Sequence, residues 1–556
     1  MTAGALGQGG AKGAAGAPGT AHVIGASSLG TVFEWYDFFL YGSLASEIAA
    51  HFFSGVDATT GFILALATFA VGFIVRPAGA LLFGRIGDLA GRKNTFLVTL
   101  ALMGFATFLV GALPGYGAIG IAAPLLLVAL RVMQGLAIGG EFGGAITYVA
   151  EHAPAASRGL QTSFIPATAL CGLLLSLVVI AATRTLMEPA EFSAWGWRIP
   201  FLASAVLLGI SMWIRLKLHE SPVFQRMKSE RTLSRAPLAE VFLRWAQCRL
   251  VLVAIFGCVL GQAVTYYAGT FYPLFFLERI ARVAPAAVTL LMASALLVAV
   301  PLTLAAGWLS DRIGRKPVLA GAVLLAALCY FPLYEALLAA ANPALAGALR
   351  DSPVVVHAAR GDCALQFDPL GRQRYDERSC DVVQSFLAHE GIGYAKRWLA
   401  AGSVARLDVG RQSVPAPDAR ALAGPGRAEA IGAFRSRAGA ALDAAGFRSA
   451  ADPGSIRWGR VFAILMALLA FTALTCGAYG ALLVELFPAR YRYTAVSFPQ
   501  NVGNGWFGGL LPAIAFMIVA ATGDIFAGLW YPVTLSAVCG LVALLALPET
   551  RGRPIH

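Results

Sequence analysis

The sequence reads Gly84-Arg-Ile-Gly-Asp88-Leu-Ala-Gly91-Arg92-Lys93 and, 223 residues later, Gly307-Trp-Leu-Ser-Asp311-Arg-Ile-Gly314-Arg315-Lys316, so that one loop motif occurs twice. A second set of residues also repeats, since Glu151, Pro154 and Arg158 match Glu485, Pro488 and Arg492, 334 residues later. The two offsets differ by 111 residues, which is close to the length of one polar segment, 341–459. Without that segment both pairs fall in register. The chain is therefore predicted to consist of two similar halves, with a domain inserted into the second.

Long apolar runs surround these motifs. The chain has 556 residues, of which 58% are hydrophobic and 13% are charged, against about 25% charged in an ordinary soluble domain. A helix needs roughly 20 apolar residues to cross a bilayer, and runs of that length recur here between short polar breaks. Twelve membrane spans are predicted, at about 23–46, 60–83, 94–113, 121–149, 160–183, 198–216, 250–277, 285–308, 317–340, 460–486, 495–520 and 526–547.

The basic residues indicate which ends of the spans face the cytoplasm. With a cytoplasmic N-terminus, the inner loops and tails hold 20 Lys and Arg residues and the short outer loops about 5. Cytoplasmic loops carry such an excess, so the net charge of +12 is interpreted as topology rather than as a nucleic-acid surface. The insertion 341–459, with 15 Lys/Arg and 12 Asp/Glu, is too charged for the bilayer. It is predicted to lie outside, in the periplasm of a Gram-negative cell.

The domain boundaries follow from these spans. Residues 1–22 are expected to be a disordered cytoplasmic tail rather than a signal peptide, because the apolar run after them contains Glu34 and Asp37. The other segments are the N-terminal six-helix half 23–216, the cytoplasmic linker 217–249, helices seven to nine at 250–340, the insertion 341–459, helices ten to twelve at 460–547 and a cytoplasmic tail 548–556. The insertion is expected to be a small, mostly helical cap, with an amphipathic helix at 376–389 and loops at 414–417 and 423–426.

Three parts of the chain carry a family resemblance. They are the two Asp-x-x-Gly-Arg-Lys loops, the segment Gly25-Ala-Ser-Ser-Leu-Gly-Thr-Val-Phe-Glu34-Trp-Tyr-Asp37-Phe-Phe-Leu-Tyr41-Gly42, and the segment Arg131-Val-Met-Gln134-Gly135-Leu-Ala-Ile-Gly139-Gly140-Glu141-Phe-Gly143-Gly144. Together they resemble the metabolite:proton symporter family of the major facilitator superfamily, over nearly all of 22–340 and 460–550. The resemblance implies an all-α membrane protein with twelve transmembrane helices in two six-helix pseudo-symmetric halves, the major facilitator fold, and a solute held between the halves. Members of this family import carboxylates, proline or betaine with protons.

The two repeated loops are expected to latch the cytoplasmic side when the carrier faces outward. Asp88 and Asp311 follow helix ends, where a carboxylate can bind a neighbouring helix N-terminus or a loop Arg. Gly84 and Gly307 are expected to let helices approach closely. The full set of expected gating residues is Gly84, Asp88, Gly91, Arg92, Gly307, Asp311, Gly314, Arg315, Glu151, Arg158, Glu485 and Arg492. The alternative is a pair of static loops whose basic residues only fix the topology.

Charged residues within the predicted spans are costly in a bilayer and therefore indicate function. The polar residues that share a helix face are Glu34, Asp37 and Tyr41 in the first span and Arg131, Gln134 and Glu141 in the fourth. We expect these charges to face a cavity and to pair with one another. A carboxylate that exchanges an Arg for a proton would couple transport to the proton gradient. Asp37 with Arg131 is the first candidate, with Glu34 or Glu141 as the second carboxylate; the alternative is a permanent structural ion pair.

A carboxylate solute would need a cationic partner within the membrane. Arg76 and Arg131 could each bind a carboxylate through paired hydrogen bonds, although Arg76 could equally serve helix packing. The expected substrate-binding residues are Arg76, Arg131, Tyr41, Gln134, Gln262, Tyr266, Asn501 and Asn504, and the polar ones among them could instead be helix contacts. Two Arg residues favour an organic anion over a zwitterion, for which Trp35, Tyr36 or Tyr267 could bind the cationic group.

The sequence gives no sign of covalent chemistry. No His/Cys spacing suggests a metal site, no cofactor is predicted, and no Walker A sequence is present that would indicate an ATP-driven pump. Cys363 and Cys380 lie in the insertion, where an oxidising periplasm would allow a disulfide. The insertion could screen or capture substrate, or it could be passive.

These features predict a secondary transporter of the bacterial inner membrane, not an enzyme, that takes up a small organic acid or zwitterionic metabolite with protons by alternating access. Its expected partners are the solute, protons and membrane lipid, without nucleic acid, and the chain is expected to be a monomer. Two alternatives remain open. One is an exporter or exchanger of the same fold, because the motifs do not encode direction. The other is a transporter-like receptor whose external insertion binds a ligand.

Overall fold

The structure is a computed structural model that describes residues 20–56, 58–90, 92–216, 237–364, 375–422, 424–447 and 450–555. Within helices, the side chains of residues 20–29, 87–94, 141–142 and a few others are not described. Several expectations therefore lie outside the described residues: most of the tail 1–22, most of the linker 217–249, Gly91, and the side chains of Asp88, Arg92 and Glu141.

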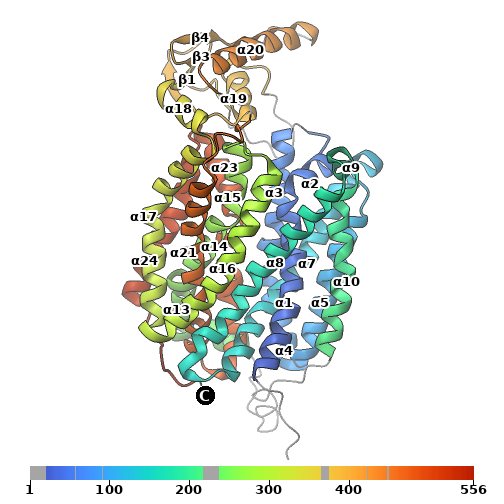
Figure 1. The fold of residues 1–556 in the computed structure, drawn as a ribbon, viewed down its shortest axis with the longest axis vertical. Coiled ribbons are helices and arrows are strands. Elements are labelled where there is room, and N and C mark those ends of the chain that lie inside the picture. Colours follow the sequence, from blue (N-terminus) through green and yellow to red (C-terminus); the bar gives the residue numbers. More distant parts are fainter. Residues whose placement is uncertain are drawn as a thin grey trace, which may run out of the picture.

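The first half of the chain is a bundle of long apolar helices that stand side by side (Figure 1). They are α1 (Thr20–Ser43), α2 (Ala45–Phe52), α3 (Ala58–Ile74), α4 (Arg76–Ala90), α5 (Arg92–Ala112), α6 (Tyr116–Ile119), α7 (Ala122–His152), α8 (Arg158–Leu186), α9 (Pro189–Ala194) and α10 (Ile199–Leu216). The second predicted span is divided between α3 and α4. The break falls just before Arg76 and Pro77, where a proline is tolerated because the first turn of a helix has no N–H partner to lose.

The second half repeats this arrangement and contains three π-helical turns. Its elements are α12 (Pro237–Phe242), α13 (Trp245–Ala254), η3 (Ile255–Val259), α14 (Leu260–Gly269), α15 (Phe271–Phe275), η4 (Phe276–Ile280), α16 (Pro285–Ile313), α17 (Arg315–Ala341), α21 (Trp458–Glu485), α22 (Arg492–Val502), η6 (Gly503–Gly508), α23 (Leu511–Thr522) and α24 (Trp530–Ala546). The π turns η3 and η6 pack on each other, and a Cβ added at Gly503 would come within 2.5 Å of Val259. Two predicted helices are therefore interrupted where their backbones meet.

Ten helical segments of the described chain are long and apolar enough to cross a membrane. They are Leu64–Ile86, Ala122–His152, Ala155–Leu186, Gly196–Trp213, Trp245–Ile280, Pro285–Ile313, Arg315–Ala341, Trp458–Glu485, Arg492–Val519 and Ala527–Ala546. A shorter apolar stretch, Leu97–Ala112, lies in α5, and α1 coincides with the first predicted span. The helical bundle expected from the sequence is confirmed, while the count of twelve spans stays a prediction.

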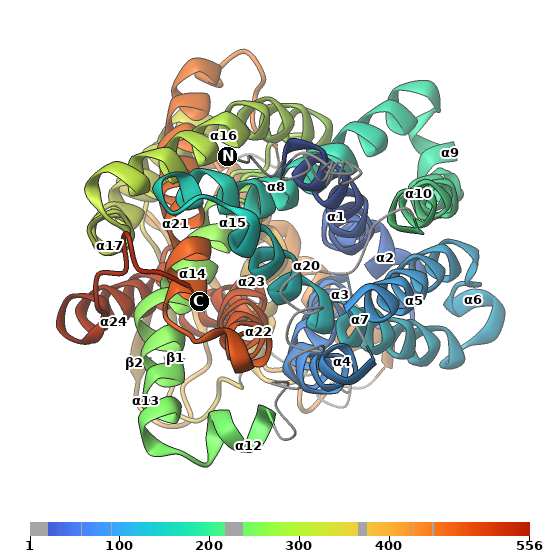
Figure 2. The ribbon, with the colours of Figure 1, turned by 90° about the horizontal axis from the view of Figure 1, so that it is seen from below.

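The two halves meet through two matching sets of helices. The sequence repeat makes α4 equivalent to α16, α7 to α21 and α8 to α22. Helix α8 of the first half packs on α16 and α21 of the second, and α22 packs on α4 and α7. Viewed from the end that carries the C-terminus, the blue and cyan first half and the green-to-red second half lie beside each other (Figure 2).

The insertion contains a β-sheet, so the expectation of a mostly helical cap is wrong. Its helices are α18 (Pro343–Asp351), α19 (Ser379–Glu390) and α20 (Gly424–Ala444), and its strands are β1 (Val354–Ala359), β2 (Ala395–Leu399), β3 (Arg406–Val409) and β4 (Gln412–Pro415). The four strands lie in the order β2-β1-β3-β4, with β1 and β2 parallel and the other pairs antiparallel. The predicted amphipathic helix is present as α19. Parts of the two expected loops belong instead to β4 and to the start of α20.

The local sequence is compatible with these strands, although it did not predict them. The run that forms β1 begins with three β-branched valines, and its residues alternate between buried and half-buried before two buried alanines. The hairpin between β3 and β4 turns at Gly410, whose φ of +55° is one that glycine adopts without steric cost. Strands of four to six residues give a short periodic signal, and the long-range pairing that stabilises them is absent from the local sequence.

The insertion stands on one end of the second half, opposite the end that carries the C-terminus (Figure 1). The backbone N–H of Tyr394 donates to the carbonyl of Gly523 at 2.7 Å, and Lys396 donates to the carbonyl of Ala521 at 3.1 Å. On the other side, the N–H of Ala451 donates to the carbonyl of Arg282 at 3.0 Å. Two backbone N–H groups and the Lys396 ammonium thus fasten the domain to the helix ends on two sides.

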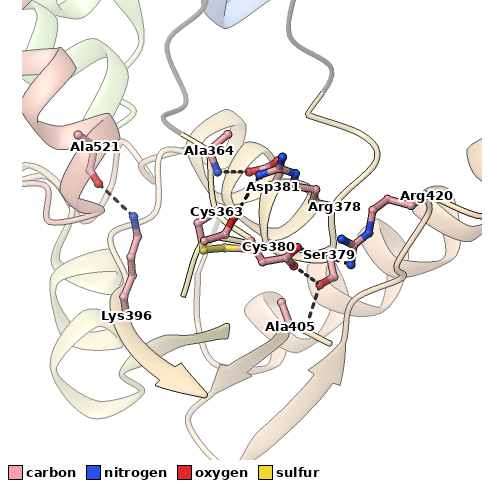
Figure 3. The surroundings of a disulfide bond; sticks show 12 residues. Cys363, Ala364, Arg378, Ser379, Cys380, Asp381, Lys396, Ala405, Arg420 and Ala521 are labelled. Carbon is pink, nitrogen blue, oxygen red and sulfur yellow. Dashed lines mark hydrogen bonds and ion pairs between the residues drawn. A yellow bond between two sulfur atoms is a disulfide. The ribbon is translucent and has the colours of Figure 1, made fainter. Parts of the chain in front are cut away.

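A disulfide joins Cys363 to Cys380 at the junction of the loop after β1 with helix α19 (Figure 3). Close to it, the N–H of Ala364 donates to the Asp381 carboxylate at 2.7 Å, and burial raises the pKa of Asp381 although this hydrogen bond opposes the shift. Ser379 donates to Asp362 at 3.0 Å and accepts from the N–H of Ala405 at 2.9 Å. The bridge and these bonds hold the two ends of the loop together.

The external position of the insertion can be tested by thiol labelling. In a background lacking the six unpaired cysteines, Arg437→Cys on exposed α20 should react with a membrane-impermeant maleimide in intact, outer-membrane-permeabilised cells. Arg551→Cys, in the exposed C-terminal segment, is the matched control and should react only after the inner membrane is lysed. Labelling of Arg551→Cys but not of Arg437→Cys in intact cells would invert the topology.

Candidate transport pathway

Arg131 lies fully buried on α7, within the first half. Its guanidinium donates to the amide oxygen of Gln134, and the Gln134 amide donates to Thr107 Oγ1 at 2.8 Å. The guanidinium carbon also lies 4.4 Å from the ring centroid of Tyr41 and 4.8 Å from that of Phe38. Two of its nitrogens, Nε and Nη2, have no hydrogen-bond partner among the described residues. The cation is therefore held in place while part of its donor capacity is left for a ligand.

Arg76 is placed in a similar way at the first position of α4. Its guanidinium carbon lies 4.3 Å from the ring centroid of Phe38, 4.5 Å from that of Phe73 and 5.6 Å from that of Trp35. The side chain is buried, and Nε and Nη2 again lack a hydrogen-bond partner within the described part of the chain. Aromatic faces stabilise a cation without using its N–H groups. Both Arg76 and Arg131 touch the ring of Phe38, so α1 brings them together.

The carboxylates of α1 are buried as expected, but they are not all paired as expected. Glu34 and Asp37 are 5% and 4% exposed. Among the described side chains no ion pair joins Asp37 to Arg131 or Arg76, and Asp37 Oδ1 accepts no hydrogen bond from them. The direct Asp37–Arg131 pair is therefore not formed in this conformation, because Arg131 is turned to Gln134 and the Tyr41 ring.

The second half contributes amides that face one another. Asn504 in η6 donates to the Gln262 carbonyl oxygen on α14 at 3.0 Å, and the Gln262 amide donates to Cys476 Sγ on α21 at 3.5 Å. Asn501 lies elsewhere, since its amide donates to the backbone carbonyls of Gly139 at 2.9 Å and Ser497 at 2.8 Å. Asn501 thus links α22 to α7, whereas Gln262 and Asn504 bond each other; their expected role in substrate binding stays a prediction.

Aromatic rings from both halves meet beside these charges, and sequence reasoning missed most of them. The ring centroid of Phe39 lies 5.2 Å from that of Phe271 and 6.2 Å from that of Tyr266. Phe73 makes a similar contact with Tyr267, at 5.5 Å. The available signal was that Phe39 lies two positions from Asp37, but an aromatic residue in an apolar helix is usually ordinary packing. This aromatic layer closes the gap between α1, α3 and the α14–α15 segment.

A carboxylate at a helix N-terminus links the halves at the end of the bundle opposite the insertion. Asp311 accepts hydrogen bonds from the backbone N–H groups of Gly159 and Leu160, both at 2.8 Å, in the first turn of α8. Its own carboxylate also pairs with Arg315 at 2.7 Å. The contact is the one expected from the repeated loop, because free N–H groups and the helix dipole favour an anion there. Its counterpart Asp88 lies among the side chains that are not described.

The repeated Glu and Arg residues form crossed ion pairs between the halves. Arg158 of the first half pairs with Glu485 of the second at 2.8 Å, and Arg492 of the second half pairs with Glu151 of the first at 3.1 Å. Arg315 adds a longer contact to Glu485 at 3.5 Å. All of these side chains are almost completely buried. The repeat makes the two Arg residues equivalent and the two Glu residues equivalent. Each Arg thus binds the Glu of the opposite half rather than the Glu of its own half.

Glycines in the repeated loops have different roles. A Cβ at Gly307 would lie 2.5 Å from Ser163 Oγ and 2.7 Å from the Gly159 carbonyl, so α16 and α8 approach closely there. Gly314 has a φ of +111°, which other residues rarely adopt. At Gly84, by contrast, the nearest atom would be 3.8 Å away, in the ring of Tyr493. The expected close approach at Gly84 is therefore wrong for this conformation.

The C-terminal segment completes the cytoplasmic network, and the sequence repeat gave no hint of it. Glu549 accepts hydrogen bonds from the backbone N–H groups of Arg315 at 3.0 Å and Lys316 at 3.1 Å, at the start of α17. Burial raises the pKa of Glu549, but four backbone N–H donors outweigh that effect and hold the pKa below its ordinary value. Thr550 donates to Glu485 at 2.7 Å, so the segment is bonded to the crossed pairs as well.

Comparisons with known proteins agree with this architecture. The family described as "Sugar (and other) transporter" matches residues 23–244. The chain is 35% identical to the inner membrane metabolite transport protein YhjE of Escherichia coli over 328 residues, which are 58% of this chain and 74% of that protein. It is 36% identical over 317 residues to the shikimate transporter of the same organism, covering 56% of this chain and 71% of the relative. The chain belongs to the metabolite:proton symporter family of the major facilitator superfamily.

The fold of this protein is also found in solved structures of transporters. The proton:xylose symporter XylE matches with a TM-score of 0.60 at 15% identity, over 96% of this chain and 97% of that chain. At this identity the likeness shows the fold alone. The family member is accordingly a transporter and not an enzyme, and a multi-pass protein of the bacterial inner membrane.

Removal of the Asp311 charge should weaken the cytoplasmic closure of this transporter. Asp311→Asn cannot accept both backbone N–H groups and pair with Arg315, so we expect a loss of about 2 kcal/mol from the closed state, or a shift of roughly 30-fold toward open states. The reporter is Thr162→Cys in the background that lacks the six unpaired cysteines. Thr162 lies on α8, buried against α21, so opening should give faster maleimide labelling in inside-out vesicles. Asp452→Asn in the insertion is the control. Unchanged labelling of Thr162→Cys would show that Asp311 is not part of the closure.

Proposed function

We propose that this protein imports a small organic acid together with protons, by alternating access and as a monomer. The observation that supports this most directly is the pair of buried guanidiniums of Arg76 and Arg131, each with N–H groups that no described residue accepts. Charged donors without partners are expensive within a bilayer. A carboxylate presents two acceptor oxygens in the plane of a guanidinium and would satisfy them.

The opposite wall of the site is neutral in this proposal. Gln262 and Asn504 would bind the uncharged polar groups of the solute, such as a hydroxyl or a keto oxygen, from the side of the second half. Tyr41, Gln134 and Tyr266 would line the space between. Asn501, which holds α22 to α7, would act on the helix contact rather than on the solute.

Proton coupling is assigned to the carboxylates of α1. Asp37 is buried beside Phe38, the ring that both guanidiniums touch, and it forms no ion pair with either. A buried carboxylate without a cation favours its protonated form, and one paired with Arg favours its ionised form. Movement of Arg131 between Gln134 and Asp37 would therefore take up and release a proton. Glu34 and Glu141 are the second candidates.

The remaining elements serve alternating access. The proposal includes twelve spans, cytoplasmic termini and a periplasmic insertion. Asp311, Arg315, Gly307, Gly314 and the crossed pairs would hold the cytoplasmic side closed, with Gly84, Asp88, Gly91 and Arg92 as the corresponding loop of the first half. The aromatic layer around Phe39 would separate the buried charges from the outer side.

A zwitterion is the second candidate solute. The ring of Tyr267 packs on Phe73, the ring that Arg76 touches, and on Tyr266, so the two tyrosines offer faces for a cationic group. The relatives' names include both an alpha-ketoglutarate permease and a proline/betaine transporter, at 35% identity each. Uptake of a labelled panel of carboxylates and zwitterions into vesicles, with and without an imposed pH gradient, distinguishes the candidates. Accumulation that is the same with and without the pH gradient would contradict the symport proposal. Efflux against the solute gradient would favour an exporter.

Loss of the titratable group at position 37 should uncouple transport. Asp37→Asn is expected to abolish accumulation driven by a pH gradient, because the amide takes up no proton, while exchange of labelled for unlabelled solute continues. Asp524→Asn, in an outer loop, is the matched control and should accumulate normally. If Asp37→Asn still accumulates solute against its gradient, another carboxylate couples the protons.

Replacement of the planar guanidinium at position 131 should impair recognition of a carboxylate. Arg131→Lys keeps the charge but loses the paired geometry, so we expect the uptake KM to rise by about 10- to 100-fold, as for one or two charged hydrogen bonds. Arg198→Lys is the control, since Arg198 donates to the backbone carbonyls of Gly111 and Leu113 and is not among the proposed solute-binding residues. A KM unchanged in Arg131→Lys would remove Arg131 from the substrate site.

A further inference from the structure

A cavity of about 960 Å³ lies between the insertion and the outer ends of the transporter helices. The insertion supplies one wall, through the end of α19, the segment that leads to β2, and residues 450–453. The second half supplies the other wall, through residues 278–285 and the end of α23, and Phe62 of the first half reaches its edge. The size is within the usual range for small-molecule sites, roughly 300–1,000 Å³. None of these residues belongs to the buried site around Arg76 and Arg131.

The walls of this cavity are fixed by specific contacts. Gly523 has a φ of +80°, and a Cβ there would lie 2.7 Å from the ring of Tyr394, so the wall is closely fitted where the insertion meets α23. Arg282 has a φ of +58° and is the one non-glycine residue with positive φ in the described part of the chain. Its carbonyl accepts the N–H of Ala451 at 3.0 Å. A strained arginine backbone that the insertion holds in place is typical of a position shaped for binding.

The cavity is lined by acidic and basic groups together. Arg279 and Arg282 supply two guanidiniums, and Glu278 and Glu390 supply two carboxylates. Burial lowers the pKa of Arg282, and the nearby Glu390 carboxylate opposes that shift, so the insertion and the transporter each contribute one member of an opposed pair. An ion of one sign would have to displace an internal partner of the same sign. A zwitterion adds no net charge and can meet a guanidinium with its carboxylate and a carboxylate with its cationic group.

The rest of the lining is apolar and partly aromatic, with Phe62, Tyr394 and Phe516 among its members. These rings favour a ligand with an apolar body, and a quaternary or secondary ammonium group gains further from an aromatic face. Lysine-like flexible ligands have no comparable advantage, because ordering a long chain costs rotamer entropy. The lining therefore suits a compact zwitterion.

One residue connects this cavity to the contact between the halves. Arg279 belongs to the second half, and its guanidinium donates to Ser46 Oγ of the first half at 2.8 Å and lies 4.1 Å from the ring centroid of Phe62. A ligand carboxylate that binds Arg279 competes with both contacts. Occupancy of the cavity would thus weaken a tie between the halves at the outer side.

We propose that this cavity is an external binding site for a compact zwitterion of the betaine or cyclic amino-acid type, formed jointly by the insertion and the transporter. The site is separate from the proposed transport site and does not require that its ligand be transported. Binding to purified protein in detergent tests it without reference to topology, proton coupling or transport direction.

The full-length Arg131→Ala protein is a suitable background, because it removes the buried guanidinium of the proposed transport site. Titration calorimetry with glycine betaine and L-proline should give saturable binding, at least tenfold tighter than binding of succinate or tetramethylammonium. Glu390→Gln and Arg279→Gln should each weaken that binding at least tenfold. Arg437→Gln, an exposed residue of the same domain, should leave it unchanged.

A second variant guards against loss of folding. Ala388→Trp projects an indole ring from α19 into the cavity without changing its charges and should also abolish binding, with size-exclusion profile and melting temperature retained. No saturable binding of either zwitterion would overturn the proposal. Binding that survives Ala388→Trp in folded protein, or succinate binding as tight as betaine binding, would overturn it as well. Loss of vesicle uptake in Arg131→Ala, with zwitterion binding intact, separates this site from the transport function.

Discussion

Asp311 accepts two backbone N–H groups at the start of α8 and pairs with Arg315, and the contact between the halves at the end opposite the insertion is built around this carboxylate. Arg315 reaches on to Glu485, Glu485 binds Arg158 and Thr550, and Glu549 caps the helix that begins with Arg315. The charges of Asp311, Arg315, Glu485 and Arg158 can be buried because each is compensated by the next one. Removing one partner from such a cluster leaves an uncompensated buried charge, which destabilises the closed arrangement. The cluster is therefore expected to open as a unit, when all of its members gain water together.

The charges in the middle of the membrane follow the opposite principle. At the cytoplasmic end nearly every buried charge has a charged or backbone partner, whereas Arg76 and Arg131 rest on aromatic rings and keep free N–H groups within the described structure. One set of charges is satisfied by the protein and serves closure. The other is incompletely satisfied and suits a ligand that arrives and leaves. A carrier needs both, since a fully satisfied site has no reason to bind solute and an unsatisfied latch does not hold.

The sequence predicted those parts of the molecule that repeat. The loop motif and its offset predicted Asp311 at a helix end, and the second repeat pointed to Glu151, Arg158, Glu485 and Arg492, although not to their crossed pairing. Apolar runs of about 20 residues predicted the helices. The features that the sequence did not reveal have neither a sequence repeat nor a long run of periodic apolar residues. They are the short strands of the insertion, the π turns at Gly257 and Gly503, and the nine residues that contain Glu549. Asp37 and Arg131 were predicted to pair with each other; both are buried but do not pair, because burial does not determine which neighbour an arginine faces in one conformation.

The position of the insertion has a consequence for biosynthesis. Helix α21 packs on α16 and α17, and Thr472 and Thr475 of α21 bond the Thr265 carbonyl and hydroxyl at 2.8 Å each. Helix α14, which contains Thr265, and helices α16 and α17 leave the ribosome before the 119 residues of 341–459, and α21 leaves after them. At ordinary elongation rates the interval is roughly 6 to 24 s. During that interval the half-assembled bundle waits in the bilayer without the contacts of Thr472 and Thr475 to Thr265, whose hydroxyl can bond only carbonyls of its own helix. A nascent chain of this transporter would therefore depend on lipid, the insertion machinery or a chaperone to shield that surface until the last three spans arrive.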